Sequence, residues 1–264
     1  MKNLLLAAAL LISANYAGAQ QDLFCGINNT SFSAGERFSV KIYYNLGSIY
    51  VSAGEAVFTT TMVTVGNRRA YHVVGQGRTF SAYNWIFKVR DNYETYIDSA
   101  NLLPIEFIRN VNEGGFHFNN YVTFDHDDGT ARTDKGVFKV PKCVQDVLST
   151  IYYARNIDFD RYKPGDKIPF DLFLDDQVYN IYIRYLGKAV VQTRFGKYHA
   201  IVFKPLLIKG TIFKGGEQMT VWVSDDRNHI PLRVDSPISV GSIKADLESY
   251  SNLRYPLTSM ISKR

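Results

Sequence analysis

The stretch CVQDVLSTIYYARNI, residues 143 to 157, is where the sequence leaves a strand pattern and predicts a helix. Asp146 in its first turn and Arg155 in its last complement the helix dipole, and Pro141 prevents an earlier start. Apolar residues recur here at steps of three and four, which places them in one stripe, away from Gln145, Ser149 and Thr150: Val144, Val147, Leu148, Ile151 and Tyr152. Such a stripe needs cover, so the helix is predicted to pack on a sheet.

Strand patterns dominate the chain on both sides of this helix. Residues 36–45 alternate, with Phe38 and Val40 on one face and Ser39 and Lys41 on the other. No second helical period occurs, which argues against a parallel sheet with crossover helices. We therefore predict an all-β fold with one main helix, either a curved antiparallel meander sheet or a partly open barrel. The other strands are expected near 49–65, 70–80, 84–97, 104–111, 116–124, 167–174, 178–193, 197–208, 211–224, 230–236 and 241–250.

A faint internal repeat links the two sides of the helix. Tyr71-His72, Ile86-Phe87-Lys88, Asp98 and Pro104 recur 126 or 127 residues later as Tyr198-His199, Ile212-Phe213-Lys214, Asp225 and Pro231. A near-constant offset indicates two related halves. We expect one β domain over residues 20–264, with halves at about 34–140 and 164–255 joined by the helix 143–157.

The N-terminus predicts export. Lys2 precedes an apolar run from 4 to 12, and Ala17-Gly18-Ala19 follows it as a small-residue cleavage site. Residues 1–19 are therefore predicted to be a signal peptide that is cleaved before Gln20. The run is shorter than the about 20 residues that span a bilayer. The mature protein is expected to be soluble, in the periplasm or outside the cell, with no transmembrane segment.

Charge excludes one class of partner. The chain has a formal net charge of +5, and removal of the signal peptide takes away one basic residue, Lys2, to leave +4. The basic residues form no run or stripe, so the sequence lacks the electrostatic footprint of a nucleic-acid-binding protein. Its 18 Tyr and 17 Phe suit a sheet, where aromatic rings cover a pleated and half-buried surface.

Two cysteines, Cys25 and Cys143, lie in the predicted mature chain. Export brings them into an oxidising compartment, which favours a disulfide between them. The alternatives are a thiolate nucleophile or a metal ligand, but the sequence contains no CxxC motif and no cysteine–histidine cluster. The predicted disulfide ties the mature N-terminus to the start of the helix.

Short motifs spread over nearly the whole mature chain carry a family resemblance. They are Ala34-Gly35-Glu36, Tyr43-Tyr44-Asn45, Ala53-Gly54-Glu55-Ala56, Phe87-Lys88-Val89-Arg90-Asp91, Cys143 with Asp146-Val147-Leu148-Ser149, Tyr152-Tyr153-Ala154-Arg155, and Met219-Thr220-Val221-Trp222-Val223-Ser224-Asp225. In this order they resemble the bacterial exported family catalogued as domain of unknown function 3108. The resemblance implies a fold and a compartment, and no activity.

A second, shorter resemblance concerns residues 221–232. Val221 to Asp225 and Ile230 to Leu232 are similar to a strand-turn-strand element of the periplasmic lipoprotein carriers and sorting proteins. Those proteins hold acyl chains between a curved antiparallel sheet and helices, so the resemblance implies an apolar ligand.

Motifs for the common enzyme chemistries are missing from the sequence. It contains no Gly-x-Ser-x-Gly elbow, HExxH motif, P-loop or dinucleotide fingerprint. His126 lies in Asp125–Gly129, which lacks the spacing of a calcium loop and predicts a hairpin turn. His72 and His199 have no paired carboxylate at a telling spacing. No catalytic residue, metal or cofactor is therefore predicted, and a hydrolase is the weakest alternative.

Aromatic residues give the candidate site. If the curved sheet does not close on the helix, the gap forms a concave apolar site with Arg155 at its mouth. An ordinary aromatic core is the alternative. The candidate lining residues are Trp85, Phe87, Tyr152, Tyr153, Arg155, Phe213 and Trp222.

The function predicted on this basis is non-enzymatic. The chain is expected to be a cell-envelope protein that binds an apolar or amphiphilic ligand, such as a lipid, or an envelope protein. A glycan-binding module is the alternative, and it requires the same aromatic residues to be exposed as flat platforms.

Overall fold

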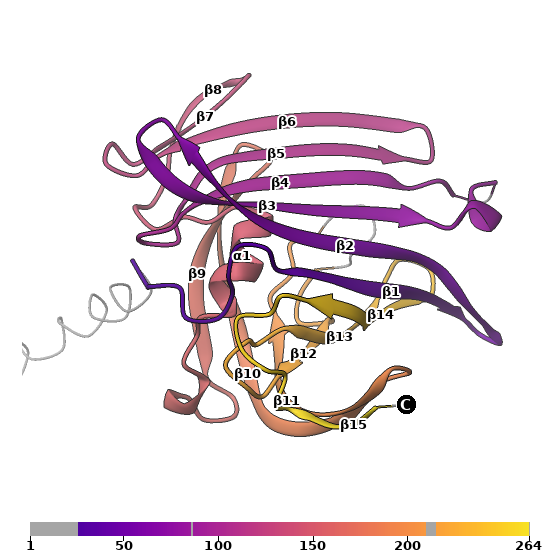
Figure 1. The fold of residues 1–264 in the computed structure, drawn as a ribbon. Helices are drawn as coiled ribbons and strands as arrows, with labels where there is room; N and C mark the ends of the chain where they lie inside the picture. The colour runs from indigo at the N-terminus through magenta and orange to yellow at the C-terminus, as the bar shows by residue number, and fades with distance from the viewer. Residues whose placement is uncertain (1–25, 86, 210–214, 264) are drawn as a thin grey trace, which may run out of the picture.

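A computed structural model describes residues 26–85, 87–209 and 215–263, and a single curved antiparallel sheet dominates it (Figure 1). The predicted sheet and single α-helix are confirmed. The first eight strands form a meander: β1 Arg37–Leu46, β2 Ile49–Val65, β3 Arg68–Thr79, β4 Arg90–Asp98, β5 Pro104–Glu113, β6 Phe116–Asp125, β7 Thr130–Thr133 and β8 Gly136–Lys139. A short 3-10 turn, Ser81–Tyr83, lies between β3 and β4.

A second meander follows the helix α1, Val147–Ala154, and a 3-10 turn at Phe159–Arg161. Its strands are β9 Lys167–Leu174, β10 Gln177–Gln192, β11 Gly196–Pro205, β12 Thr220–Ser224, β13 Pro231–Pro237 and β14 Ser242–Ser251. A last strand, β15 Met260–Lys263, pairs with β11. The short strands β7, β8 and β15 are absent from the sequence prediction because four residues are too few to show a period.

The two meanders join through β1 and β14, so the sheet runs β8-β7-β6-β5-β4-β3-β2-β1-β14-β13-β12-β11-β10-β9. It is not closed, because β8 and β9 are the two edges of this path among the described residues. Side chains bring the edges together: the Phe173 ring lies 5.8 Å from that of Phe138, and Thr133 Oγ1 donates to Asp176 at 2.9 Å. The partly open barrel of the prediction describes this shape.

Repeat positions occupy corresponding places in the two meanders. Tyr71 and Tyr198 lie near the starts of β3 and β11, and Pro104 and Pro231 are the first residues of β5 and β13. A proline is acceptable there because the first residue of a strand need not donate to the ladder. The duplication of two halves stays a prediction, since equivalent positions alone do not establish a common origin.

Helix α1 is shorter than the predicted 143–157. Asp146 is its N-cap and forms a capping box with Ser149, while Arg155 is its C-cap. Ahead of the cap the chain is extended: the Gln145 backbone N–H donates to Asp171 O and its carbonyl accepts from Phe173 N, both at 2.9 Å. These residues pair with the exposed edge of β9, which explains why the helix starts late.

The helix lies inside the curve of the sheet (Figure 1). A first apolar cluster fills the space between α1 and the concave face, and it includes Phe32, Phe38, Phe107, Leu148 and Tyr152. A second cluster lies on the other face of β9–β12, where the segment after the helix covers it with Ile157 and Phe159. Gln145, ahead of the helix, and Ser149, in its first turn, are also buried, so polar side chains at the start of the helix are enclosed by the fold.

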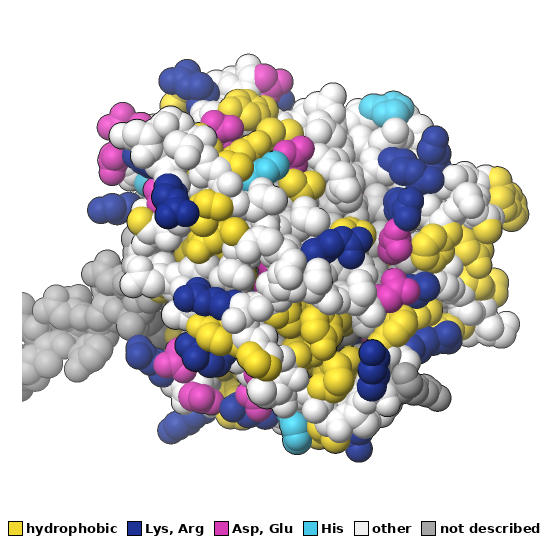
Figure 2. Space-filling view, in the orientation of Figure 1, with side chains coloured by type: hydrophobic (Ala, Val, Ile, Leu, Met, Phe, Trp, Pro, Cys, Tyr) yellow, Lys and Arg dark blue, Asp and Glu magenta, His cyan; other side chains and the backbone are white. Residues whose placement is uncertain are grey.

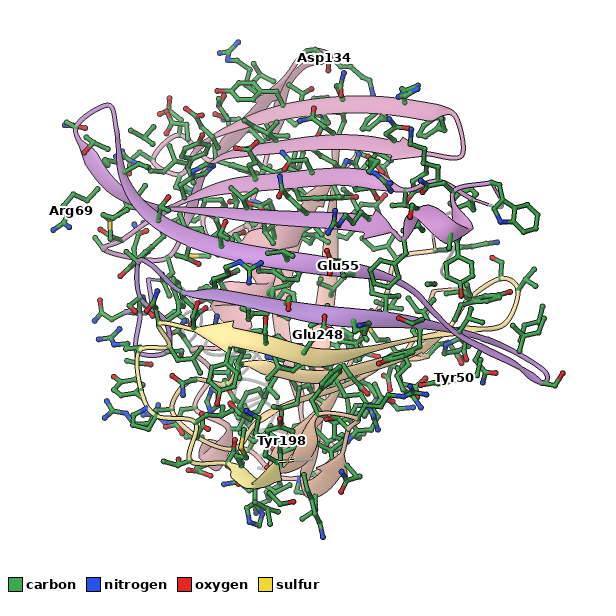
Figure 3. All side chains as sticks on the ribbon, turned by 45° about the vertical axis from the view of Figure 1, so that its right-hand side comes forward. Tyr50, Glu55, Arg69, Asp134, Tyr198 and Glu248 are labelled. Carbon is green, nitrogen blue, oxygen red and sulfur yellow. The ribbon has the colours of Figure 1, made fainter. Side chains whose placement is uncertain are left out.

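The connections between strands alternate between two ends of the sheet. We call tip end the one that holds the β1–β2, β3–β4, β5–β6 and β13–β14 connections. Tyr50 marks the tip end in Figure 3, and Arg69 marks the opposite end, where β2 turns into β3.

Candidate functional site

An apolar pocket of about 240 Å³ lies between α1 and the concave face of β2, β3 and β4. Of its described lining residues, only Asp91 and Tyr93 carry ionisable side chains. The others are Ala56, Phe58, Gly75, Gln76, Gly77, Val147, Leu148 and Ile151. The structure therefore contains the gap between helix and sheet on which the predicted function depends.

Two glycines of β3 create the space. Gly75 and Gly77 are two residues apart on a strand, so they share the inner face. A Cβ at Gly75 would lie 3.1 Å from the Phe58 ring and 3.6 Å from Leu148, whereas a Cβ at Gly77 would meet nothing within 4 Å. Neither glycine has a positive φ. Their missing side chains, and not a special backbone conformation, leave room beside the helix.

The apolar stripe of α1 forms the other wall. Leu148 is buried in the core, while Val147 and Ile151 are half-buried and border the pocket. On the far side of the stripe the Thr60 hydroxyl donates to Tyr152 Oη at 3.2 Å, which fixes the helix against β2. One part of the stripe therefore packs in the core, and the other part forms a wall of the pocket.

One carboxyl group, that of Asp91, lies at the edge of the pocket nearer the tip end, and Glu113 lies beside it. Asp91 Oδ1 accepts from the Asn112 backbone N–H at 2.9 Å. Burial raises the pKa of Glu113, and the neighbouring Asp91 carboxylate raises this pKa further. Burial also raises the pKa of Tyr93. The pocket therefore has an apolar interior and one polar edge.

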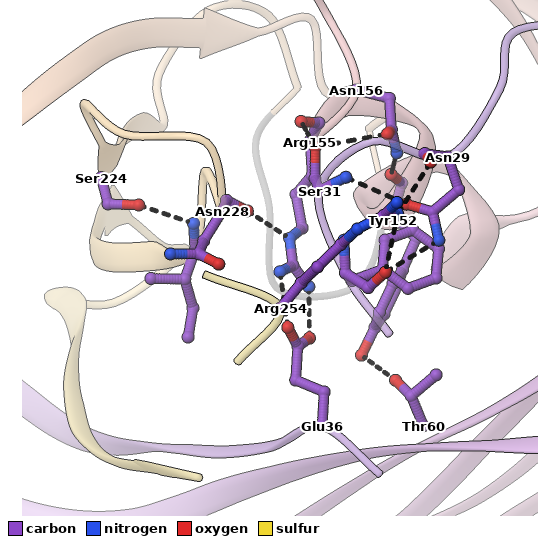
Figure 4. A network of polar contacts seen from close by, with 12 residues as sticks. Asn29, Ser31, Glu36, Thr60, Tyr152, Arg155, Asn156, Ser224, Asn228 and Arg254 are labelled. Carbon is purple, nitrogen blue, oxygen red and sulfur yellow. Dashed lines mark hydrogen bonds and ion pairs between the residues drawn. The ribbon is translucent and has the colours of Figure 1, made fainter. Parts of the chain in front are cut away.

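A buried ion pair holds the C-terminal end of α1 (Figure 4). The Arg155 guanidinium donates to both carboxylate oxygens of Glu36, at 2.6 and 2.8 Å, and neither side chain is more than 2% exposed. Its Nε donates to the Asn228 carbonyl at 3.0 Å. A bidentate pair of this kind has fixed geometry. It links the helix to the start of β1 and to the β12–β13 connection.

The start of α1 is fixed by Asp146, which is fully buried. Its carboxylate accepts from Thr95 Oγ1 at 2.6 Å, from Leu148 N at 2.7 Å and from Ser149 N at 2.8 Å. Burial raises the pKa of Asp146 to about 6, although these hydrogen bonds lower it in part. The helix that walls the pocket is thus anchored by polar contacts at both ends.

The structure does not bring the predicted lining residues together. Tyr152, Tyr153 and Arg155 are buried, so Arg155 lies inside the protein and not at the mouth of a gap. Trp222 is partly buried against the first apolar cluster. The other three lie elsewhere: Trp85 is 83% exposed, Phe87 is exposed over Gly114, and Phe213 lies outside the described residues.

The residues that do line the pocket were mostly missed by sequence reasoning. Helix residues Val147, Leu148 and Ile151 were identified as a stripe, but as cover for a sheet. The signal that could have revealed the pocket is Gly75 and Gly77, two small residues at a spacing that places them on one face of a predicted strand.

A second, polar cleft of about 520 Å³ lies near the opposite end and includes Asp160, Asp225 and His229. Lys188 pairs with both of these carboxylates, at 3.0 and 3.1 Å. His229 Nδ1 lies 2.7 Å from the Arg155 carbonyl, which can only accept, so this nitrogen carries the proton. Burial lowers the pKa of His229. Each of these groups already has a partner within the chain, which favours the apolar pocket as the candidate site.

His72, His126 and the two cysteines are other residues considered for catalysis or metal binding. His72 Nε2 lies 2.8 Å from a Glu94 oxygen. His126 lies in the predicted turn, between β6 and β7, and its two ring nitrogens each lie 2.8 Å from a backbone carbonyl. The described residues contain no group of three or more His, Cys, Asp or Glu that could hold a metal ion. Cys25 lies outside the described residues, so its disulfide with Cys143 stays a prediction.

Comparison with known proteins identifies the family of this chain. The model of a protein family of unknown function, DUF3108, matches residues 37–248. The chain belongs to the DUF3108 family. This confirms the resemblance seen in the sequence motifs, and the matched segment contains α1 and all the strands that line the apolar pocket. No curated protein matches the chain.

A solved structure has a similar fold. A β-barrel-like DUF1849 protein from Brucella abortus has a TM-score of 0.56 at 9% identity, with 84% of this chain and 99% of that chain covered. At this identity the likeness shows the fold alone. Two further matches are a candidate lipoprotein from Parabacteroides distasonis (TM-score 0.38, 11% identity, 85% and 100% covered) and a candidate exported protein with a YmcC-like fold from Bacteroides fragilis (0.35, 13%, 84% and 98%).

One further finding concerns the membrane. No helix among the described residues is long and apolar enough to cross a bilayer.

Proposed function

We propose that this DUF3108 protein is an exported envelope protein that binds an apolar chain, such as an acyl chain, between α1 and strands β2–β4. The observation that carries the proposal is the 240 Å³ apolar pocket along the helix. An apolar cavity tends to stay dry, and cavities of about 150 Å³ already bind small apolar molecules. The open space beside Gly77 thus favours an apolar ligand over water.

Size and polarity narrow the ligand class. Pockets for drug-sized ligands measure about 300–1,000 Å³, so this pocket suits one chain or a single small ring better than a large polycyclic molecule. The carboxyl group of Asp91 at one edge suits a polar group at one end of the ligand. An amphiphile combines both properties.

The proposed compartment is the periplasm or the cell exterior, with the protein soluble after removal of residues 1–19. The N-terminal pattern supports it, since a basic residue, an apolar run and a small-residue site follow in order. The proposal concerns binding, and the lining residues support it because they offer no nucleophile beside a base.

The test is a titration with a fluorescent probe that carries an alkyl chain. Gly77→Leu places a side chain in the open part of the pocket and is expected to weaken binding at least about tenfold. Arg78→Leu is the matched control, because it places the same apolar side chain on the outer face of the same strand, at a residue that does not line the pocket. Equal binding by wild type and Gly77→Leu, or no binding by wild type, would contradict the proposal.

A glycan-binding module remains the second candidate because Trp85 is 83% exposed, as a flat sugar platform requires. It predicts retention on insoluble polysaccharide that is lost in Trp85→Ala and unchanged in Gly77→Leu. The opposite pattern, retention unaffected by Trp85→Ala, would rule this candidate out.

A further inference from the structure

Exposed apolar side chains gather at the tip end of the sheet. Among the described residues, seven of the thirteen exposed large apolar side chains lie on its connections or beside them. Trp85 is 83% exposed, Val240 61% and Phe116 60%. We call these seven residues the apolar rim: Leu46, Ile49, Tyr50, Trp85, Phe87, Phe116 and Val240.

The rim residues come from four separate connections. They lie on β1–β2, β3–β4, β5–β6 and β13–β14, which antiparallel pairing brings to one end. The β1–β2 hairpin extends furthest, because β3 ends at Thr79, opposite Gly54, five residues after β2 begins. In Figure 2 hydrophobic side chains show on the right-hand side of the molecule, where Figure 1 places these tips.

Burial in the folded chain does not explain the rim. Phe87 covers Gly114, and the Tyr50 ring stacks on Tyr43 at 5.4 Å, but both rings remain more than 40% exposed. Exposed apolar side chains that occur singly are ordinary on protein surfaces, whereas a gathering at one end marks an interaction site. The rim therefore calls for a partner.

We infer that the apolar rim docks on the surface of a lipid bilayer. A rigid protein partner needs one continuous surface, but the rim is divided among separate tips. A lipid interface accepts each tip independently, and Trp and Tyr prefer the headgroup level of a membrane. Lys88, exposed beside Phe87, and Arg194, whose guanidinium carbon lies 5.2 Å from the centroid of the Tyr50 ring, add attraction to anionic lipids.

The place of the pocket is consistent with this docking. The open space beside Gly77 lies near the end of β3, two residues before Thr79 and the β3–β4 connection that carries Trp85. Docking would thus bring this side of the pocket towards the lipid from which an acyl chain could enter. This use rests on the proposed function, but binding of the rim to a bilayer does not.

The experiment is co-sedimentation of the mature protein with vesicles of phosphatidylcholine that contain a minority of phosphatidylglycerol. The rim variant is Ile49→Ser/Trp85→Ser/Phe116→Ser. We expect wild type to bind and the rim variant to bind at least about tenfold more weakly, since each apolar side chain that stays in water costs roughly tenfold in partitioning. A variant with three exposed residues away from the tips, Tyr121→Ser/Val190→Ser/Tyr250→Ser, is the matched control and should bind like wild type.

A second measurement reads the rim directly. In Trp222→Phe the remaining tryptophan is Trp85, so its emission should shift to the blue with vesicles and be quenched by brominated lipid. Equal losses in the rim and control variants, no binding by wild type, or a dimer without lipid that only the rim variant dissociates would overturn the inference. Gly77→Leu separates the two proposals, because it should still bind vesicles while losing the alkyl probe.

Discussion

The ion pair between Glu36 and Arg155 offers a double-mutant cycle of large expected effect. Both side chains are buried, so Glu36→Leu leaves an uncompensated guanidinium and Arg155→Met leaves an uncompensated carboxylate. Removal of one partner of a buried pair typically costs about 3–5 kcal/mol. Rings of Phe32 and Tyr152 lie 5.4 and 5.3 Å from the Arg155 guanidinium carbon and cannot replace the lost charge.

The double variant should recover most of this loss. Replacement of both charges by apolar groups is often close to neutral. One penalty persists here, because Arg155 Nε no longer donates to the Asn228 carbonyl, and an orphaned buried acceptor costs about 1–3 kcal/mol. We therefore expect the double variant to lose about 1–3 kcal/mol of unfolding free energy, less than either single variant.

Urea unfolding followed by circular dichroism measures all four proteins, and equal slopes against urea concentration would show that the same surface unfolds in each. If the two single losses simply add in the double variant, the side chains act independently. That result would refute the argument that the pair is a coupled anchor of α1.

Three further predictions concern the helix cap, the cysteines and an ion pair on the β10 side of the sheet. Burial raises the pKa of Asp146 from 3.8 to about 6, so between these pH values the folded chain holds a proton that the unfolded chain has lost. The unfolding free energy therefore falls as pH rises from 3.8 to about 6, by up to about 3 kcal/mol. Asp146→Asn keeps a capping side chain and should abolish that fall in urea titrations at pH 4 and 7.5; an unchanged fall would contradict the assignment. Reduction of the predicted Cys25–Cys143 disulfide should cost about 4–5 kcal/mol in the chain-entropy model and lower Tm, while Cys143→Ser should melt alike with and without reductant. Arg184 and Tyr182 hydrogen bonds lower the pKa of Glu217 to about 2, so its contribution is present above about pH 4.5 and lost as pH falls through 2. Because both Glu217 and Arg184 are partly exposed, Glu217→Gln should cost only about 0.5–1 kcal/mol at pH 7, and no difference from wild type at pH 7 would contradict the pair's role.

The fold could be predicted from the sequence because its signals are local. Alternation along residues 36–45 and the three- and four-residue steps of Val147, Leu148 and Ile151 each report one element. The start of the helix was less predictable, because Gln145 is extended and pairs with β9. This pairing is a contact between separate segments of the chain. Sequence periodicity contains no information about such an edge.

The sequence could predict the type of site, an apolar gap beside the helix, but not the residues that line it. The sequence leaves two alternatives, an ordinary aromatic core and a gap between helix and sheet, and it predicts that large aromatic residues line the gap. The structure buries Tyr152 and exposes Trp85. A pocket forms where side chains are small, so Gly75 and Gly77 mark it better than any ring. Arg155 was predicted as a polar group at the mouth of the gap, but it is buried. Its partner, Glu36, lies 119 residues away in sequence, and no local pattern connects the two.

Native mass spectrometry of the protein purified from its own envelope tests the central claim most directly. Wild type should carry an added mass that organic solvent extracts as a molecule with an alkyl chain. Gly77→Leu, purified in parallel, should show the mass of the protein alone, while Arg78→Leu keeps the addition. A bare mass for wild type that stays bare after incubation with alkyl amphiphiles, or an addition that Gly77→Leu retains in full, would contradict the account.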